Sequence, residues 1–317
     1  MSIGFGFGKI ILIGDQFINY GVPAVVSAID LKTMAIVEKI RRTGDRMWVV
    51  KDKRKETPGY KKSKLRQQEE SIRRILEAVK VSLEGFSLKI VFEGDLVAAS
   101  GLGASAASCV SLVRALNAEF QLGLKDVEIN EIAYEGEKAY HGNPSGVDNT
   151  ASTFGDIFLF RKDTSPGTNL IERIDLRKNL ELVVADSGVV VNTAAVGEYI
   201  RAQMKKYPGK FESAREAIVS MLSECRRYLE SFNLAMVGRL MTEYHKVVIG
   251  LGLSHKKLIH LCNLAIENGA LGAKLTGGGM GGNMIALTPG IELQEKVAFA
   301  LEREGYHVLR VKIGENA

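Results

Sequence analysis

Continuous apolar runs and stretches with helical periodicity follow one another along the first half of the chain. Short apolar runs predict buried strands, and apolar residues three and four positions apart predict the buried face of a helix, as at Ile72, Ile75 and Val79. We expect strands at 9–13, 24–40 (one or two strands), 47–50, 88–92 and 150–160, and helices at 64–83, 104–120 and 126–140.

The second half is richer in helical patterns. After a strand at 180–185 we expect helices at 194–206, 211–232, 234–249 and 256–268, strands at 273–276 and 284–287 on either side of a glycine run, a helix at 293–304 and a strand at 306–313. Strands and helices do not alternate regularly, which favours a two-domain α+β protein over a βαβ-built one. A Ser-Pro-Gly turn at 165–167 lies near the expected domain boundary, and we divide the chain into domains 1–178 and 179–317.

Composition limits the class of protein. The 317 residues are 46% hydrophobic and 25% charged, which is typical of a folded globular chain. There is neither a run of 18 apolar residues nor a signal-peptide pattern, and the 3 cysteines have no metal or disulfide spacing, so we expect reduced thiols in a cytoplasmic protein without a membrane partner. The net charge of +5 suits an anionic ligand. Acidic residues dilute the basic segment 41–74, which predicts a solvated surface and no nucleic-acid partner.

The chain has 33 glycines, above the usual ~7% of residues, and one cluster lies directly before the predicted helix 104–120. The sequence is Ser-Gly-Leu-Gly-Ala-Ser-Ala-Ala-Ser at 100–108. Glycines let the backbone turn its N–H groups inward, and a helix N-terminus favours anions, so this segment suits a polyphosphate. Ser105 offers a hydroxyl group to Mg²⁺. A tightly packed loop without a ligand remains the alternative, and the Walker A pattern is absent.

A second glycine cluster, Lys-Leu-Thr-Gly-Gly-Gly-Met-Gly-Gly at 274–282, formally contains GxGxxG. The dinucleotide-binding motif requires a helix to begin at the glycines, whereas the sequence after this cluster predicts a strand. We therefore expect a hairpin that closes over a ligand.

Two further segments carry candidate chemistry. Asp148 lies in a polar loop at 141–149, after a helix that contains Glu137. Asp148 suits a general base, and Glu137 suits a Mg²⁺ ligand because Mg²⁺ prefers oxygen donors. Lys9 opens a buried strand, where its charge would neutralise a carboxylate or a phosphate. In isolation, a surface Asp and a Lys that reaches solvent remain open alternatives.

In this order the four segments resemble the GHMP kinases, over nearly the whole chain. Within that family, Gly-Asn-Pro-Ser-Gly-Val-Asp-Asn at 142–149 is most similar to the mevalonate kinases. The resemblance implies the α+β GHMP kinase fold, with an N-terminal domain like domain 2 of ribosomal protein S5 and a ferredoxin-like C-terminal domain, and with ATP and substrate meeting between them. The implied reaction is ATP-dependent phosphorylation of (R)-mevalonate to 5-phosphomevalonate, in isoprenoid biosynthesis. Whether the chain forms a homodimer stays open.

The resemblance also implies a role for each site residue. Asp148 would take or orient the proton of the substrate hydroxyl, and Lys9 would lower the pKa of that hydroxyl. Ser105 and Glu137 would bind Mg²⁺, and Asp15, Gln16 and Thr193 would lie near the acceptor. The ATP phosphates would contact Ser100, Gly101, Leu102, Gly103, Ala104, Ser105, Ala106, Ala107 and Ser108, and also Gly277, Gly278 and Gly279.

Two departures from the family pattern fall on the acceptor side. The chain reads Gly-Asp-Gln at 14–16, where mevalonate kinases usually read Gly-Glu-His, and Val191 stands where some relatives have a basic residue. The alternatives are therefore a GHMP kinase for phosphomevalonate, a sugar or another hydroxy acid, and a non-catalytic GHMP-fold ligand sensor. A sensor should lack the aspartate or the Mg²⁺ ligands, which are present here.

Overall fold

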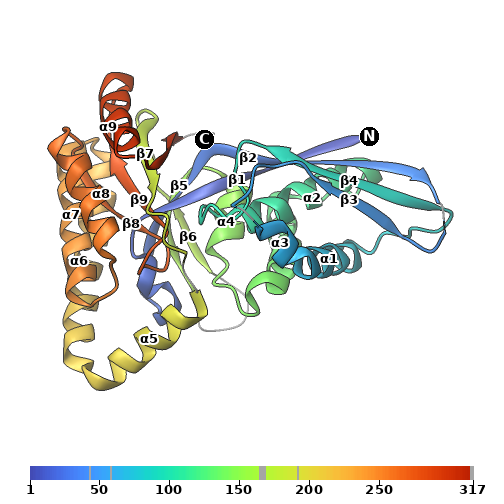
Figure 1. Ribbon diagram of the computed structural model, residues 1–317. Coiled ribbons are helices and arrows are strands. Elements are labelled where there is room, and N and C mark those ends of the chain that lie inside the picture. The colour runs from blue at the N-terminus through green and yellow to red at the C-terminus, as the bar shows by residue number, and fades with distance from the viewer. Residues whose placement is uncertain (43, 58, 164–168, 191–192, 315–317) are drawn as a thin grey trace. The chain divides into compact units, whose positions relative to one another are not determined.

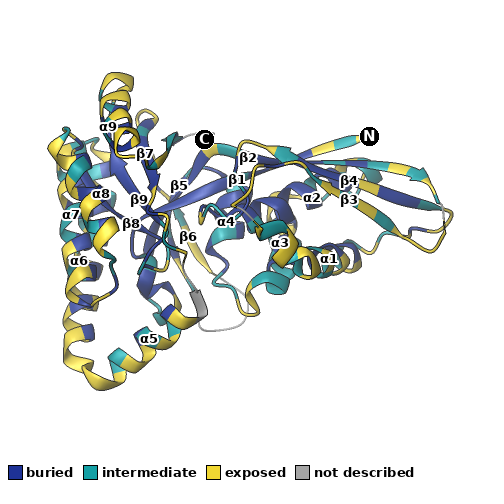
Figure 2. Ribbon diagram, viewed as in Figure 1, coloured by how far each residue is buried: buried dark blue, intermediate teal, exposed yellow. Residues whose placement is uncertain are grey.

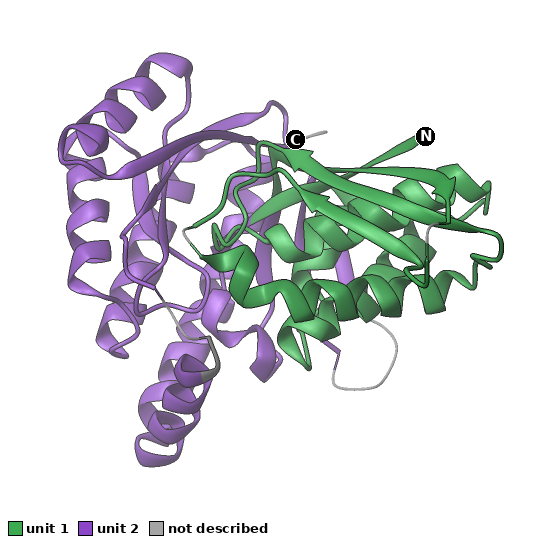
Figure 3. Cartoon of the chain, turned by 45° about the vertical axis from the view of Figure 1, so that its right-hand side comes forward, with its two compact units in different colours: residues 1–9, 28–155 green, residues 10–27, 156–317 purple. Residues whose placement is uncertain are grey.

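The computed structural model describes residues 1–42, 44–57, 59–163, 169–190 and 193–314, with the backbone alone at 193 and 194. Packing divides the chain into two units, residues 1–9 with 28–155 and residues 10–27 with 156–317 (Figure 3). This division by packing differs from the domain boundary that we placed after residue 178. The boundary after residue 178 stays a prediction. The turn predicted at 165–167 and the departure at Val191 lie outside the described residues.

Strands β1 (Ser2–Ile13) and β2 (Ala24–Arg41) pair with each other, and each contributes residues to both units. In unit 1 (1–9 and 28–155), β2 pairs antiparallel with β4 (Phe86–Gly94), which pairs in parallel with β3 (Trp48–Asp52). The helices of unit 1 are α1 (Tyr60–Val79), α2 (Ala104–Phe120), α3 (Asp126–His141) and α4 (Val147–Phe154), as drawn in Figure 1.

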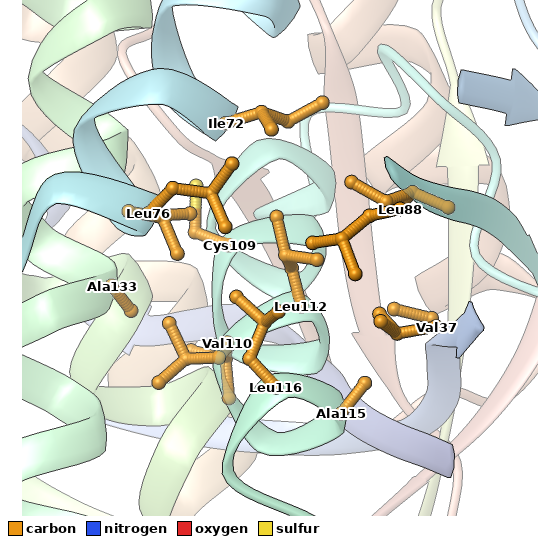
Figure 4. Close-up of a cluster of buried hydrophobic side chains, with 14 of the residues drawn as sticks. Val37, Ile72, Leu76, Leu88, Cys109, Val110, Leu112, Ala115, Leu116 and Ala133 are labelled. Carbon is orange, nitrogen blue, oxygen red and sulfur yellow. The ribbon is translucent and has the colours of Figure 1, made fainter. Parts of the chain in front are cut away.

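Helix α2 lies at the centre of the unit 1 core. It is buried along most of its length (Figure 2), whereas α1 buries only one face. Figure 4 shows α2 side chains such as Leu112 and Leu116 among apolar residues of α1, α3, β2 and β4. Small residues, including Ala106 and Ala107, are fully buried in the first turns of α2. The core therefore fixes the N-terminal end of α2, where the glycine loop at 100–103 enters the helix.

Unit 2 (10–27 and 156–317) contains the second half of the pattern. The start of β2 pairs with β5 (Ile157–Arg161), and β5 pairs with β6 (Leu170–Arg173). A short 3₁₀ helix, η1 (Asp15–Tyr20), follows β1. The larger elements are β7 (Leu180–Asp186), α5 (Thr193–Lys206), α6 (Pro208–Glu230), α7 (Leu234–Gly250), α8 (Lys256–Glu267), β8 (Gly272–Thr276), β9 (Asn283–Leu287), α9 (Ile291–Arg303) and β10 (His307–Ile313).

The second sheet of unit 2 has the strand order β10-β7-β9-β8, with every neighbouring pair antiparallel. This is the strand order of a ferredoxin-like layer, as the family resemblance implied. Helices α7 and α8 pack against β8, and α9 packs against β7 and β10. Strands β8 and β9 form the expected hairpin, with Thr276 opposite Asn283 and the glycine run between them.

The predicted strand at 150–160 is wrong in its first half. Residues 147–154 form α4, and β5 begins only at Ile157. Threonines and an aromatic residue favour a strand by propensity, but α4 packs against α2 and α3, and tertiary packing overrides propensity. Thr150 also donates its hydroxyl hydrogen to the Gly146 carbonyl, one helical turn back, at 2.7 Å. Strand β6 was not predicted.

Two further expectations concern cysteines and membranes. All 3 cysteines are buried and form no disulfide, as expected. Within the described ranges, no helix is long and apolar enough to span a bilayer.

Candidate functional site

Lys9 and Asp148 form an ion pair in unit 1. The Lys9 Nζ atom lies 3.2 Å from Asp148 Oδ1, and the Lys9 side chain is only 7% exposed, whereas that of Asp148 is 29% exposed. Asp148 belongs to the first turn of α4, where the helix dipole stabilises a carboxylate. A lysine that cannot reach solvent and a partly exposed carboxylate are thus held together, with carboxylate surface left for a third group.

The glycine loop lies against Lys9. The Lys9 backbone N–H donates to the Leu102 carbonyl at 2.8 Å, which ties β1 to the loop. Gly103 has a φ of 76°, a left-handed conformation, and a Cβ atom there would lie 2.9 Å from Lys9 Cγ. Glycine is therefore required at this position both by backbone geometry and by the close approach of Lys9. Gly103 precedes α2 and supplies no side-chain cap, so the first N–H groups of the helix remain available to an anion.

Ser105 and Glu137 come together beside this loop. The Glu137 side chain is 2% exposed, and its Oε2 atom lies 3.7 Å from His141 Nε2, which lies 3.5 Å from Ser105 Oγ. Burial, followed by the nearby Asp148 carboxylate, raises the pKa of Glu137 to about 8, while the Ser105 hydroxyl and Lys9 act to lower it. A buried carboxyl group with a raised pKa is a candidate functional group.

These residues fit a Mg²⁺ ion. Glu137 Oε1 is buried and has no hydrogen-bond partner among the described residues, so one carboxylate oxygen remains to ligate a cation. Mg²⁺ is usually held by one or two protein oxygens together with substrate phosphates and water. The described residues contain no cluster of three or more His, Cys, Asp and Glu side chains placed for a metal.

The glycine loop is also supported by an arginine from the basic segment 41–74. The Arg54 side chain is only 5% exposed, although the sequence predicted a solvated surface for this segment. Its guanidinium binds both carboxylate oxygens of Asp52, at 3.0 and 2.7 Å. It also donates to the Ala104 carbonyl at 3.1 Å and to Ser108 Oγ at 2.6 Å. A buried guanidinium–carboxylate pair therefore contacts the first turn of α2.

In unit 2, the glycine run 277–282 forms the turn of the β8–β9 hairpin. Gly279 has a φ of 95°, and a Cβ atom there would lie 2.4 Å from the Leu253 carbonyl oxygen, so only glycine fits. Beside Gly277 and Gly278, a Cβ atom would meet nothing within 4 Å. The hairpin thus packs against the Leu253 backbone at Gly279, whereas there is open space beside Gly277 and Gly278.

Asp15 and Gln16, predicted to lie near the acceptor, are buried against this hairpin. The Asp15 side chain is fully buried and lies 2.6 Å from Lys274 Nζ, while the Gly277 N–H donates to it at 2.7 Å. Gln16 Nε2 donates to the Gly277 carbonyl at 2.5 Å, and the Tyr244 hydroxyl donates to Gln16 Oε1 at 2.6 Å. The acceptor role of Asp15 and Gln16 stays a prediction.

The remaining predicted residues occupy different environments. In the loop 100–108, the side chains of Leu102, Ala104, Ala106, Ala107 and Ser108 are buried, whereas Ser105 is partly exposed. Ser100 and Gly101 complete the loop, and Gly101 has a φ of 73°. Thr193 begins α5, and its side chain lies outside the described residues.

Sequence reasoning assigned no role to Arg54, His141, Tyr244 or Lys274. His141 was detectable, because it lies four residues after Glu137 and therefore on the same helix face. Lys274 was also detectable, because a lysine in an apolar strand carried the argument for Lys9. Nothing in the sequence marks Tyr244, since its contact with Gln16 depends on the tertiary fold.

Comparisons with known proteins agree with the fold. The family model for the GHMP kinases N terminal domain matches residues 70–156, and that for the GHMP kinases C terminal domain matches residues 221–307. The mevalonate kinase of Pyrococcus abyssi is 31% identical over 324 residues, covering 94% of this chain and 91% of that protein. The crystal structure of L. major mevalonate kinase in complex with R-mevalonate is 32% identical, with a TM-score of 0.92, covering 100% of this chain and 97% of that one.

Proposed function

The chain belongs to the GHMP kinase family, and we propose that it is a mevalonate kinase that transfers the γ-phosphoryl group of ATP to the 5-hydroxyl group of (R)-mevalonate. It is an ATP-dependent kinase that acts on an alcohol group. The observation that carries the proposal is the Lys9–Asp148 ion pair, held beside a glycine loop that opens a helix. Similarity to mevalonate kinases over more than nine-tenths of the chain favours (R)-mevalonate as the acceptor.

Asp148 and Lys9 act on the attacking hydroxyl group. The hydroxyl donates its proton to the partly exposed Asp148 carboxylate, which also orients the hydroxyl so that an oxygen lone pair points at the γ-phosphorus. As the new P–O bond forms, the bond to the bridging oxygen of ADP breaks, and Asp148 keeps the proton. Lys9 is held at 3.2 Å from Asp148 and stabilises the negative charge that develops around the transferred group.

The backbone of the glycine loop binds the phosphates. Gly101 and Gly103 have left-handed conformations, and the N–H groups of the first turn of α2 have no side-chain cap. Anions are favoured at such a terminus, and the buried Arg54 network fixes its position. Charge stabilisation by fixed donors is the main contribution in phosphoryl transfer, because the donors need no reorganisation as the reaction proceeds.

Mg²⁺ would be held by Ser105 and Glu137. When bound, it supplies charge neutralisation at the ATP phosphates. Burial raises the pKa of the Glu137 carboxyl group to about 8, and the charge of a bound cation would favour its ionised form. Ser105 is the one partly exposed side chain in the first turn of α2, so its hydroxyl group is accessible from the phosphate side of the loop.

A direct assay of phosphoryl transfer tests this function. Purified protein with ATP and Mg²⁺ should release ADP when (R)-mevalonate is added, and ³¹P NMR should identify 5-phosphomevalonate as the product. (S)-Mevalonate, phosphomevalonate, galactose and homoserine are the comparison acceptors. Faster ADP release with one of these acceptors would contradict the proposed substrate, and ATP binding without release for any acceptor would indicate a sensor.

A further inference from the structure

We propose that Asp15, Gln16, Tyr244 and Lys274 are positioning residues that hold the first glycine of the β8–β9 hairpin, rather than groups that contact the acceptor. The inference rests on the proposed function, because the family resemblance assigns Gly277, Gly278 and Gly279 of this hairpin to the ATP phosphates. All four residues belong to unit 2, and they come from η1, α7 and β8. We name this set of four residues the hairpin clamp.

Both polar backbone groups of Gly277 are held by adjacent side chains. Its N–H donates to Asp15 Oδ1 at 2.7 Å, and its carbonyl accepts from Gln16 Nε2 at 2.5 Å. Gly277 itself has a φ of 95°, and there is open space where a side chain would be. Two side chains therefore set the orientation of the two peptide units that meet at Gly277, and the position where its side chain would be is open.

A fully buried ion pair fixes the position of Asp15. The side chains of Asp15 and Lys274 are both 0% exposed, and Lys274 Nζ also donates to the Ile11 carbonyl at 2.9 Å. Thr276 Oγ1 donates to Asp15 Oδ1 at 3.2 Å. With donors from three residues around it, the Asp15 carboxylate has no exposed surface for a small-molecule acceptor.

Gln16 is fixed in the same way by Tyr244. The tyrosine ring is fully buried in α7, its hydroxyl donates to Gln16 Oε1 at 2.6 Å, and the Lys274 ammonium lies 5.1 Å from the ring centroid. The amide of Gln16 is thereby oriented, with its oxygen accepting from Tyr244 and its nitrogen donating to Gly277. The glutamine at this position thus has a structural use that does not involve the acceptor.

Tyr244 permits a test that leaves the buried charges in place. Tyr244→Phe removes a single hydroxyl group, and Gln16→Met removes the amide at nearly constant volume, whereas substitution of Asp15 or Lys274 would leave one buried charge unpaired and endanger folding. Tyr228→Phe is the matched control, because it removes a tyrosine hydroxyl from α6 in the same unit, and the observed partner of that hydroxyl is Arg227. Each variant is assayed for kcat and for the KM of ATP and of (R)-mevalonate. Hydrogen–deuterium exchange is measured over residues 273–287.

If the hairpin clamp positions Gly277, Tyr244→Phe lowers kcat about threefold to tenfold, as expected for one hydrogen bond, and Gln16→Met lowers it further. In both variants the mevalonate KM stays within twofold of the wild-type value, and hairpin amides exchange faster. The control variant matches wild type in every measurement.

A different pattern of effects on KM and on hairpin exchange would overturn the inference. If Gln16→Met raises the mevalonate KM tenfold while Tyr244→Phe and hairpin exchange are unchanged, Gln16 contacts the acceptor. If the wild-type protein releases no ADP with mevalonate, the proposed function fails. Exchange in the hairpin then still decides whether the clamp holds Gly277.

Discussion

Lys9 Nζ lies 3.2 Å from Asp148 Oδ1, which joins a buried strand residue to the first turn of a short helix. The pair is asymmetric, since the lysine is enclosed and the carboxylate is partly exposed. The partly exposed carboxylate can deprotonate a hydroxyl group, and the buried positive charge beside it can stabilise the negative charge that then develops.

Asp148→Asn should lower kcat by about 10²-fold or more, because the amide no longer accepts a proton from the attacking hydroxyl. ATP affinity should be retained, since the glycine loop that binds the phosphates is unchanged. The variant is compared with wild type by steady-state kinetics and by calorimetric titration with ATP. Asp156→Asn, at a position outside unit 1, serves as the control. Near-normal kcat in Asp148→Asn would remove this residue from the catalytic role.

Glu137→Gln should raise the Mg²⁺ concentration needed for half-maximal activity by about tenfold or more, because the amide is a poorer ligand than a carboxylate. Glu135→Gln is the matched control on the same helix, since Glu135 is 43% exposed and pairs with Lys138. Activity is measured against Mg²⁺ concentration at saturating ATP. An equal Mg²⁺ requirement in both variants would show that Glu137 is not a ligand.

The sequence predicted those parts of the molecule that local patterns specify. The glycine pair at 101 and 103 marked the start of α2 correctly, because a left-handed glycine directly before an apolar helical pattern has few other uses. The hairpin at 277–282 was predicted for the same reason, since an apolar strand on each side leaves the glycines to form the turn. In both places the residues that decide the conformation are adjacent in sequence.

The parts that were missed depend on contacts between distant segments. Helix α4 was assigned as strand because Thr150 and Thr153 favour strands, and the packing of α4 against α2 is not visible in the sequence. The contact between Asp15 and Lys274 was also missed, because the two residues lie far apart along the chain, and the acceptor role of Asp15 stays a prediction. A single sequence contains no signal that pairs these two charges.

Gly103→Ala should raise the KM of ATP and lower stability. An alanine at a φ of 76° is strained by about 1–2 kcal/mol, and its Cβ would also lie 2.9 Å from Lys9 Cγ. Gly123→Ala is the control, because Gly123 has a φ of 70° but open space where the Cβ would be. Both variants should melt at a lower temperature in thermal unfolding, but only Gly103→Ala should change the KM of ATP. A similar KM in the two variants would show that the contact with Lys9 is unimportant.

Arg54→Met should destabilise the protein by about 3–5 kcal/mol at neutral pH, because it leaves the buried Asp52 carboxylate without its guanidinium partner. The loss is measured by urea unfolding. Arg73→Met is the control, since Arg73 is 47% exposed and its ion pairs with Glu70 and Glu77 contribute little. Equal losses in the two variants would contradict a special role for the buried pair.

The same pair predicts a dependence of stability on pH. Burial alone would raise the pKa of Asp52, but the hydrogen bonds and charge of Arg54 and the charge of Lys61 together lower it. Because the folded-state pKa lies below the unfolded value of about 3.9, this stabilisation is complete above that value and is lost as the pH falls through the folded-state pKa. The difference in unfolding free energy between wild type and Arg54→Met should therefore be largest near neutral pH and should shrink as the pH falls towards the folded-state pKa of Asp52 in wild type. A difference that stays constant down to pH 3 would show that the Asp52 carboxylate is not stabilised by Arg54.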